Sequence, residues 1–408
     1  MIKPLKIAVV FDQVIEDGGG YQQSLNAALL IKKISDSIVD PVFITTRDAN
    51  VEILRGYGIE AVYLSFSAFQ IAFNKMKRIF IGQLWVLRLL HRLSGHNQLE
   101  RQFADYGIDL VYFLSPSLLA INLECLNYMT TVWDLSHLED PEFPEIRERY
   151  EFENREYFYK NVLPKASGII VDSIDGKNNV CRFYGISDDR VTVIPFSPAL
   201  GTVISDDEYR KGFIDIKEKY QLKMPYVFYP AQLWAHKNHI YILEGLKILK
   251  EKYGYTVGVI FAGGNKGNFE YLCQQVNSYD IVDRVRFAGF VPNEEMPYLY
   301  KQSLALVMPT YFGPTNLPPL EAMRLGVPVL YSNKNGLKNQ TDGAALLLDL
   351  QDPESMALHI VNLLEDSQLS LSLKELGFAK INEFSEIACV QSMEKIFTKF
   401  QRKRICWE

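Results

Sequence analysis

The stretch that decides the fold runs Met308-Pro-Thr-Tyr-Phe-Gly-Pro-Thr-Asn-Leu-Pro-Pro-Leu-Glu-Ala-Met-Arg-Leu-Gly326. A short apolar strand ends at Met308, and a loop rich in glycine and proline follows it. Proline suits the first turn of a helix and glycine its end, so we expect a helix that opens near Pro318 and closes at Gly326. Another apolar strand starts at Val327. This order predicts a parallel sheet covered by helices.

The same alternation of short β-branched runs and helical patterns extends along most of the 408 residues. It forms two series, because the sequence between Pro195 and Thr202 interrupts it. The strands expected in the first series are Ile7–Phe11, Pro41–Thr45, Ala61–Leu64, Asp109–Phe113, Thr130–Trp133, Gly168–Val171 and Val191–Ile194. Those expected in the second series are Tyr226–Tyr229, Val257–Ala262, Val285–Ala288, Leu304–Met308, Val327–Tyr331 and Ala345–Leu348.

Two such series predict an α/β protein of two Rossmann-like, doubly wound parallel-sheet domains. We place the N-terminal domain at 1–198 and the C-terminal domain at 199–385, and we expect 386–408 to form a helix that packs back on the N-terminal domain. Open parallel sheets bind ligands at the carboxyl ends of their strands, so the expected site is a cleft between the domains.

The composition excludes several classes of protein. A hydrophobic fraction of 48% and a charged fraction of 23% are ordinary for a globular chain, and a net charge of −6 gives no reason to expect nucleic-acid binding. The five cysteines form no CxxC pair, which favours inert thiols in a reducing compartment such as the cytoplasm. No apolar run reaches the ~18 residues of a membrane span. No Asp-x-Asp metal motif occurs.

One segment, Ser67 to Leu99, combines aromatic and aliphatic residues with a basic charge and has no acidic residue. Its basic residues are Lys75, Lys77, Arg78, Arg88 and Arg92. A basic amphipathic helix can lie on an anionic membrane surface. The alternative is a domain helix with its apolar face in the core and its basic face in solvent. The basic tail Lys399–Arg404 is interpreted as a solvated end.

The loop after Met308 delivers free backbone N–H groups at a helix N-terminus, which suits a diphosphate. We expect Glu321 in the first turn of this helix, where its carboxylate can accept two hydrogen bonds from a ribose diol. The alternative is that Glu321 merely complements the helix dipole.

Leu-Pro-Pro-Leu-Glu-Ala-Met323 after a Phe-Gly turn resembles the signature of the family-4 retaining glycosyltransferases. The resemblance implies the GT-B fold and a nucleotide-sugar donor used without a metal or other cofactor. That signature has two glutamates separated by seven residues; the second matches Glu321, but Gly313 stands in place of the first. Phe312–Asn316 resembles a variant among bacterial surface-polysaccharide transferases. The resemblance places these residues beside the donor: Gly313, Pro314, Thr315, Asn316 and Leu317.

A second block, Tyr229-Pro-Ala-Gln-Leu-Trp-Ala-His-Lys-Asn-His239, supports the resemblance. Lys237 and Asn238 match the family's Lys-Asn pair, whereas Gln232 stands where an arginine is expected. Lys237 is a point charge suited to a leaving diphosphate. Without the resemblance it would be interpreted as a surface lysine.

Two further strand ends carry glycines. The family resemblance places Gly263 and Gly264, together with Phe290, near the nucleoside base. It also places Gly19 and Gly20, which follow the first strand, near the donor phosphates and the acceptor. Each block alone is only a strand-to-loop turn.

Asp134 and His137 follow the strand that ends near Trp133, and we expect both to face the cleft. The family often has a His-Asp pair at this strand end; here Trp133 occupies the usual histidine position. His137 could contact sugar or acceptor, or it could be a hydrogen-bonded structural histidine.

Together these features predict a retaining, metal-independent transferase that moves a sugar from a nucleotide diphosphate donor to a saccharide or lipid-linked acceptor. Lys237, Glu321, His137 and Asp134 are the candidate catalytic residues. The acceptor is expected on 1–198 and the donor on 199–385, with a peripheral membrane contact through 67–99. The alternative is a non-catalytic nucleotide-sugar-binding subunit. An epimerase or phosphorylase of the same fold, and an NAD-dependent enzyme, which would need a clean GxGxxG, are weaker alternatives.

Overall fold

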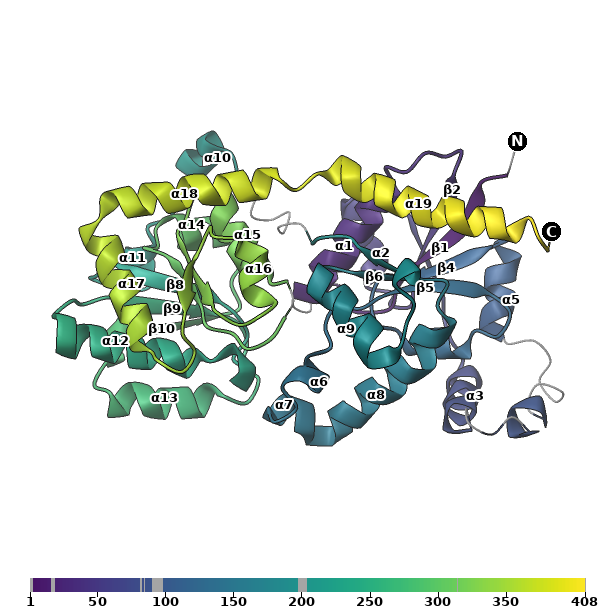
Figure 1. Cartoon of the computed structure of the whole chain (residues 1–408), viewed down its shortest axis with the longest axis horizontal. Coiled ribbons are helices and arrows are strands. Elements are labelled where there is room, and N and C mark those ends of the chain that lie inside the picture. The colour runs from purple at the N-terminus through teal and green to yellow at the C-terminus, as the bar shows by residue number, and fades with distance from the viewer. Residues whose placement is uncertain are drawn as a thin grey trace. The chain divides into compact units, whose positions relative to one another are not determined.

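The computed structural model describes residues 3–15, 19–80, 83, 85–89, 98–196, 204–313 and 315–407. The chain forms two compact units (Figure 1). Unit 1 contains Met1–Leu135, Glu153–Phe196 and Ser385–Glu408, and unit 2 contains Ser136–Phe152 and Ser197–Phe384. The segment 136–152, which lies within the expected N-terminal domain 1–198, belongs to unit 2.

Unit 1 is built on a seven-stranded parallel sheet in the order β3-β2-β1-β4-β5-β6-β7. Its strands are β1 Leu5–Phe11, β2 Val39–Thr45, β3 Ala61–Tyr63, β4 Leu110–Phe113, β5 Asn127–Thr131, β6 Gly168–Val171 and β7 Val191–Val193. The strand order reverses between β1 and β4, which is the point where such sheets bind ligands. All seven expected strands are present, although β5 ends at Thr131, two residues before Trp133.

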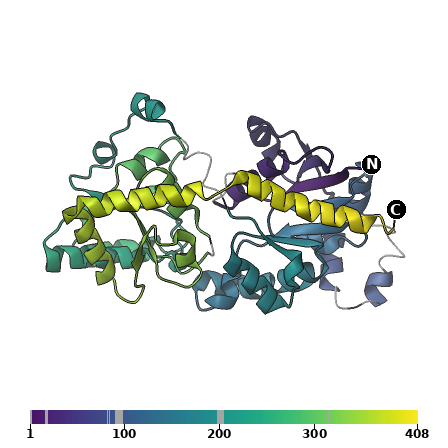
Figure 2. The same ribbon diagram turned by 45° about the horizontal axis from the view of Figure 1, so that its top comes forward.

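The helices of unit 1 follow from caps and buried apolar stripes. In α9, Ser173 caps the first turn through a hydrogen bond from Gly176 N, and Gly185 ends the helix in the left-handed conformation. The last helix, α19, packs on α1 and buries Met393 and Phe397 (Figures 1 and 2). The helices longer than one turn are α1 Gly19–Ile31, α2 Asn50–Gly56, α3 Ala68–Ile79, α5 Gln98–Asp105, α8 Glu151–Val162, α9 Ile174–Tyr184 and α19 Glu386–Arg404.

Unit 2 has a six-stranded parallel sheet in the order β10-β9-β8-β11-β12-β13, which reverses between β8 and β11. Its strands are β8 Tyr226–Pro230, β9 Gly258–Ala262, β10 Val285–Gly289, β11 Leu306–Met308, β12 Val329–Ser332 and β13 Leu346–Leu348. Tyr226, Val227 and Phe228 are fully buried, because helices cover both faces of the sheet.

The deciding helix is α15, Leu317–Arg324, with Asn316 as its N-cap residue and Pro318 in its first turn. Gly326 follows it with a φ of +68°, so the predicted proline start and glycine end are confirmed. The other helices of unit 2 are α6 Ser136–Glu139, α7 Pro144–Arg147, α10 Asp206–Lys211, α11 Ile216–Lys219, α12 His239–Tyr253, α13 Phe269–Ser278, α14 Met296–Lys301, α16 Leu337–Thr341, α17 Glu354–Glu365 and α18 Ser367–Asn382.

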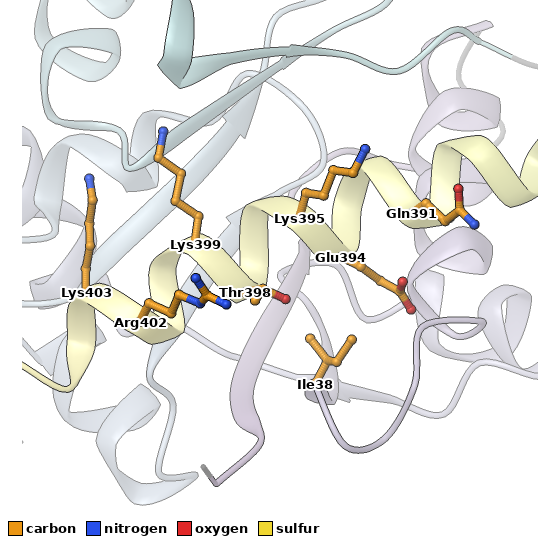
Figure 3. A pocket seen from close by; sticks show the side chains of 8 residues that line it. All are labelled: Ile38, Gln391, Glu394, Lys395, Thr398, Lys399, Arg402 and Lys403. Carbon is orange, nitrogen blue, oxygen red and sulfur yellow. The ribbon is translucent and has the colours of Figure 1, made fainter. Parts of the chain in front are cut away.

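A hollow of about 630 Å³ opens beside α19 in unit 1 (Figure 3). Its lining residues are Ile38, Gln391, Glu394, Lys395, Thr398, Lys399, Arg402 and Lys403. None of these is a predicted site residue, and Lys399 is already paired with the carboxylate of Asp189 at 2.7 Å. Among the described residues, no helix combines the length and the apolar character needed to cross a membrane.

Candidate functional site

Two loops of unit 2 meet at the point where its strand order reverses. One follows β8 and carries Lys237 in a single 3-10 turn, Ala235–Lys237; the other follows β11 and leads into α15. The ammonium of Lys237 donates a hydrogen bond of 3.2 Å to Oδ1 of Asn316. The structure thus brings together two predicted donor-binding residues that are 79 positions apart.

Asn316 is the residue that organises the second loop. Its side chain is buried and does not cap α15. Instead, Nδ2 donates to the hydroxyl of Tyr331 at 2.7 Å and to the carbonyl of Phe312 at 3.2 Å. With Nδ2 fixed in this way, Oδ1 is turned toward Lys237. The backbone N–H of Asn316 also donates to Oε1 of Gln340 at 3.0 Å.

Gly313, which replaces the first signature glutamate, has a structural reason to be glycine. Its φ is +102°, a conformation that side chains other than glycine rarely adopt. A Cβ at this position would also lie 3.0 Å from both side-chain polar atoms of Asn316. Thr315 is partly buried and Leu317 begins α15, whereas Pro314 lies outside the described residues.

Glu321 lies in the second turn of α15, because the helix begins at Leu317. The expectation of a first-turn glutamate was therefore wrong, and simple complementation of the helix dipole does not account for this side chain. Glu321 is buried, and its Oε2 accepts a hydrogen bond of 2.6 Å from the hydroxyl of Tyr300. Sequence reasoning missed Tyr300, because no spacing relates a tyrosine in α14 to a glutamate in α15.

The other predicted donor-binding residues of unit 2 line the ends of β8, β9 and β10. Gly263 has a φ of +152°, and a Cβ there would lie 2.4 Å from the carbonyl oxygen of Ala231, so only glycine permits this approach. Gly264 accepts a hydrogen bond from Leu233 N at 3.0 Å. Oε1 of Gln232 accepts a hydrogen bond from the indole of Trp234. Asn238 has a left-handed backbone at the start of α12, and Phe290 is 80% exposed.

The predicted residues of unit 1 lie beyond the ends of β1 and β5. Gly19 and Gly20 are the first residues of α1, and a Cβ on Gly20 would lie 2.7 Å from the ring of Trp133. The close approach of helix and indole therefore requires glycine at this position. Asp134 forms a two-pronged ion pair with Arg155, with distances of 2.7 and 3.3 Å.

His137 belongs to unit 2, whereas Asp134 belongs to unit 1. The ring of His137 is fully buried and lies edge-on to Phe152, with 5.7 Å between ring centroids. The His137 side chain is therefore not exposed at the surface. A role for either residue in catalysis stays a prediction.

Residues 212–379 match the family model described as Glycosyl transferases group 1. The O-antigen chain mannosyltransferase B of Escherichia coli is 28% identical over 272 residues, which cover 64% of this chain and 67% of that protein. An E. coli relative, the UDP-Gal:alpha-D-GlcNAc-diphosphoundecaprenol alpha-1,3-galactosyltransferase, is 27% identical over 225 residues, 51% of this chain and 54% of that protein. The chain also spans about half the length of two other curated relatives that it matches.

Solved structures share the fold across both units. HepE of Anabaena in complex with UDP-glucose matches with a TM-score of 0.72 and 16% identity, covering 97% of this chain and 100% of that one. WaaG, a glycosyltransferase involved in lipopolysaccharide biosynthesis, matches with a TM-score of 0.64 and 12% identity, covering 96% and 99%. The chain thus has two Rossmann-like units in the GT-B fold, and its residues 212–379 are similar to the group 1 glycosyltransferases.

Proposed function

We propose that this transferase moves a sugar from a nucleotide diphosphate donor to a saccharide or lipid-linked saccharide during synthesis of a surface polysaccharide or glycolipid. The single observation that carries the proposal is the meeting of Lys237 and Asn316, 3.2 Å apart, between the ends of β8 and β11. Ligands of open parallel sheets bind where the strand order reverses. The names of the relatives, O-antigen mannosyltransferases and a galactosyltransferase, support the class of product.

In the proposed donor site, a positive charge and the N-terminus of a helix bind the diphosphate. Lys237 supplies the positive charge, and the backbone N–H groups of the first turn of α15 supply hydrogen bonds to phosphate oxygens. Glu321, one turn further along, holds the ribose. In this scheme Asn316 acts chiefly by orienting Lys237.

The proposed reaction retains the anomeric configuration and requires no metal. The bond between the sugar's anomeric carbon and the diphosphate oxygen breaks, and negative charge develops on the diphosphate beside Lys237. The acceptor hydroxyl oxygen then bonds to the same face of the anomeric carbon. Its proton passes to the departing diphosphate, so no protein nucleophile is required.

We also propose that α3 and residues 85–89 contact an anionic membrane surface. The helix α3 buries polar side chains and exposes apolar ones. Gln70, Asn74 and Lys77 are buried, while Ile71 and Ile79 are 47% and 76% exposed. Lys77 is paired with Glu124 and therefore does not serve a lipid headgroup. Trp85 and Leu89 are also exposed apolar residues, and Lys75 and Arg88 are exposed basic residues. Exposed apolar and basic residues together favour a lipid headgroup region at the inner face of the membrane.

The experiment that tests donor binding is a thermal-shift and hydrolysis screen with UDP-, GDP- and TDP-sugars. Ligand at ~100 times its dissociation constant stabilises the folded protein by ~2.7 kcal/mol. We expect one nucleotide class to raise the midpoint of the wild type and of the exposed controls Lys223→Ala and Glu375→Ala. We expect it to leave Lys237→Ala and Glu321→Ala unchanged.

Slow release of free nucleotide by the wild type would support transfer chemistry. Binding without any turnover would instead favour the non-catalytic subunit. If no nucleotide sugar binds, or if binding is indifferent to Lys237 and Glu321, the proposed donor site is wrong.

A further inference from the structure

The segment 136–152, here called the docking segment, reaches the site of unit 2 from an unexpected part of the chain. In sequence it follows β5 of unit 1 and ends at the start of the helix α8, most of which also belongs to unit 1, yet its contacts make it part of unit 2. It contains the short helices α6 and α7, whose four residues each are too few to bury much of an apolar stripe. Its position therefore depends on a few specific side chains.

Glu145 makes the most specific of these contacts. One carboxylate oxygen, Oε1, accepts a hydrogen bond of 3.0 Å from the backbone N–H of His236 and is also bonded to Nδ1 of the same residue. The side chains of Glu145 and His236 are only 10% and 12% exposed. The nearly buried carboxylate of Glu145 is thus bonded to two groups of His236, which is 91 positions further along the chain.

The docking segment also touches the second loop. Phe143 lies among the rings of His236, Tyr311 and Phe312, with centroid distances of 6.3, 5.3 and 5.0 Å. Asp140 is paired with Lys334, whose ammonium donates to the carbonyl of Tyr311 at 3.0 Å. These contacts fix the start of the loop that leads to Asn316.

His236 connects the two loops of the site. Its carbonyl accepts a hydrogen bond of 2.9 Å from Tyr311 N, and its ring stacks on Phe312 at 4.3 Å with 17° between the planes. The next residue is Lys237, whose carbonyl accepts from the hydroxyl of Tyr229 at 2.9 Å. The turn that carries Lys237 is therefore tied on one side to β8 and β11 and on the other side to Glu145.

The charge state of the pair agrees with this geometry. Burial by itself would raise the pKa of Glu145, but the hydrogen bonds from the His236 ring and backbone outweigh it and hold the pKa below its ordinary value. Glu145 is consequently a carboxylate at neutral pH, and it is a strong acceptor for the turn.

We propose that Glu145 is a positioning residue for Lys237: it fixes the 3-10 turn through His236, so that the ammonium meets Asn316 and faces the diphosphate of the donor. This inference rests on the proposed function, in which Lys237 binds a nucleoside diphosphate. A small displacement of a group that binds a charged ligand weakens binding strongly, because the geometry of each hydrogen bond is demanding.

The test is Glu145→Gln, which keeps the shape of the side chain and removes its charge. The probe is the free nucleoside diphosphate of the class that binds in the donor screen, and its dissociation constant is measured by calorimetry on the full chain. We expect this constant to rise roughly 10- to 100-fold. The donor KM is expected to rise in parallel. A matched control is Glu295→Gln, which removes another nearly buried, paired carboxylate of unit 2; it bonds Lys219 and Tyr220.

Glu295→Gln is expected to lower thermal stability without changing nucleotide affinity. A lowered thermal midpoint with unchanged affinity in Glu145→Gln as well would overturn the inference, because it would show a structural role only.

A double-mutant cycle shows whether Glu145 acts through Lys237. In a Lys237→Ala background, Glu145→Gln should cause little further loss of affinity. Additive losses would contradict the inference, because Glu145 would then act independently of Lys237. If Lys237→Ala alone leaves affinity unchanged, the proposed function fails at its first step, and the role of Glu145 fails with it. If instead Lys237→Ala weakens nucleotide binding and Glu145→Gln does not, the proposed function stands and only the role of Glu145 is rejected.

Discussion

The hydroxyl of Tyr300 donates a hydrogen bond of 2.6 Å to Oε2 of Glu321, and both side chains are buried in unit 2. Burial, together with the adjacent Glu321 carboxylate, raises the pKa of Tyr300 well above its ordinary value. The phenol therefore keeps its proton and remains a donor throughout the physiological range. The bond holds the carboxylate of Glu321 in one orientation, as the proposed binding of a ribose diol requires.

We expect Tyr300→Phe to weaken nucleotide binding by ~10-fold, which corresponds to ~1.4 kcal/mol. The reason is that Glu321 loses the partner that orients it. The loss of a partner to a buried carboxylate should also lower the free energy of unfolding by about 1–3 kcal/mol. Calorimetry and denaturant unfolding measure the two effects separately.

The matched control is Tyr226→Phe, which removes a buried hydroxyl bonded to the carbonyl of Leu299 at 2.8 Å. This variant should lose stability but keep its nucleotide affinity. Equal affinities in the wild type and in Tyr300→Phe would show that Glu321 needs no such partner.

Gly313→Ala should be destabilising for two separable reasons. A left-handed backbone costs an L-residue about 1–2 kcal/mol, and the new Cβ would crowd Asn316 at 3.0 Å. Gly343→Ala provides the comparison, because Gly343 has a φ of +85° and no atom within 4 Å of the added Cβ. We expect the Gly313 variant to be less stable than the Gly343 variant and to bind nucleotide more weakly. Equal losses of unfolding free energy and unchanged binding would contradict the crowding of Asn316.

His239 should make the protein sensitive to moderate acid. Its ring is fully buried beside Tyr229 and Phe261, and burial lowers its pKa to about 3, with the nearby charges of Lys237 and His236 adding to the effect. Because the folded-state pKa lies below the ordinary value of 6.5, the unfolded state takes up the proton first. Stability from this residue is therefore complete above pH 6.5 and is lost as the pH falls toward 3.

We expect the unfolding free energy of the wild type to fall by up to ~1.4 kcal/mol per pH unit from this residue alone. His239→Phe keeps a ring between the same neighbours and removes the titration, so its stability should depend less on pH between 6.5 and 4. Denaturant unfolding at several pH values gives both curves. Parallel curves would show that the buried ring is not the origin of the acid sensitivity.

The triple variant Ile71→Ser, Ile79→Ser, Trp85→Ser should bind vesicles that contain anionic lipid several-fold more weakly than the wild type, with an unchanged thermal midpoint. These side chains are exposed, so the folded state loses little when they are replaced. Ile387→Ser on α19, an exposed isoleucine of unit 1, is the control and should bind as the wild type does. If the wild type does not bind such vesicles, or if the triple variant binds them equally well, this surface is not a membrane contact.

Much of the fold could be predicted because parallel strands buried on both faces leave a clear pattern of short apolar runs. Every expected strand is present. The helix α15 has its prolines in the first turn and ends shortly before Gly326. Topology predicts that Lys237 and Asn316 lie near each other, since both residues lie on loops that follow strands flanking the reversal of strand order.

Other features could not be predicted. The helices of the docking segment are too short for a periodic pattern, and the partner of Glu145 is 91 residues away. Likewise, the sequence around a buried tyrosine does not show whether its hydroxyl donates to a backbone carbonyl, as in Tyr226, or to a buried carboxylate, as in Tyr300. Such pairings are decided by tertiary packing, which no local pattern encodes.

The fit of Gly313 against Asn316 also constrains how this loop could have evolved. A one-step change of Gly313 to glutamate would meet an unfavourable backbone and a crowded neighbour at once, while a change of Asn316 alone would release Lys237. A glutamate at position 313 would therefore require accompanying changes around Asn316. Engineering that transplants the missing glutamate must transplant its surroundings as well.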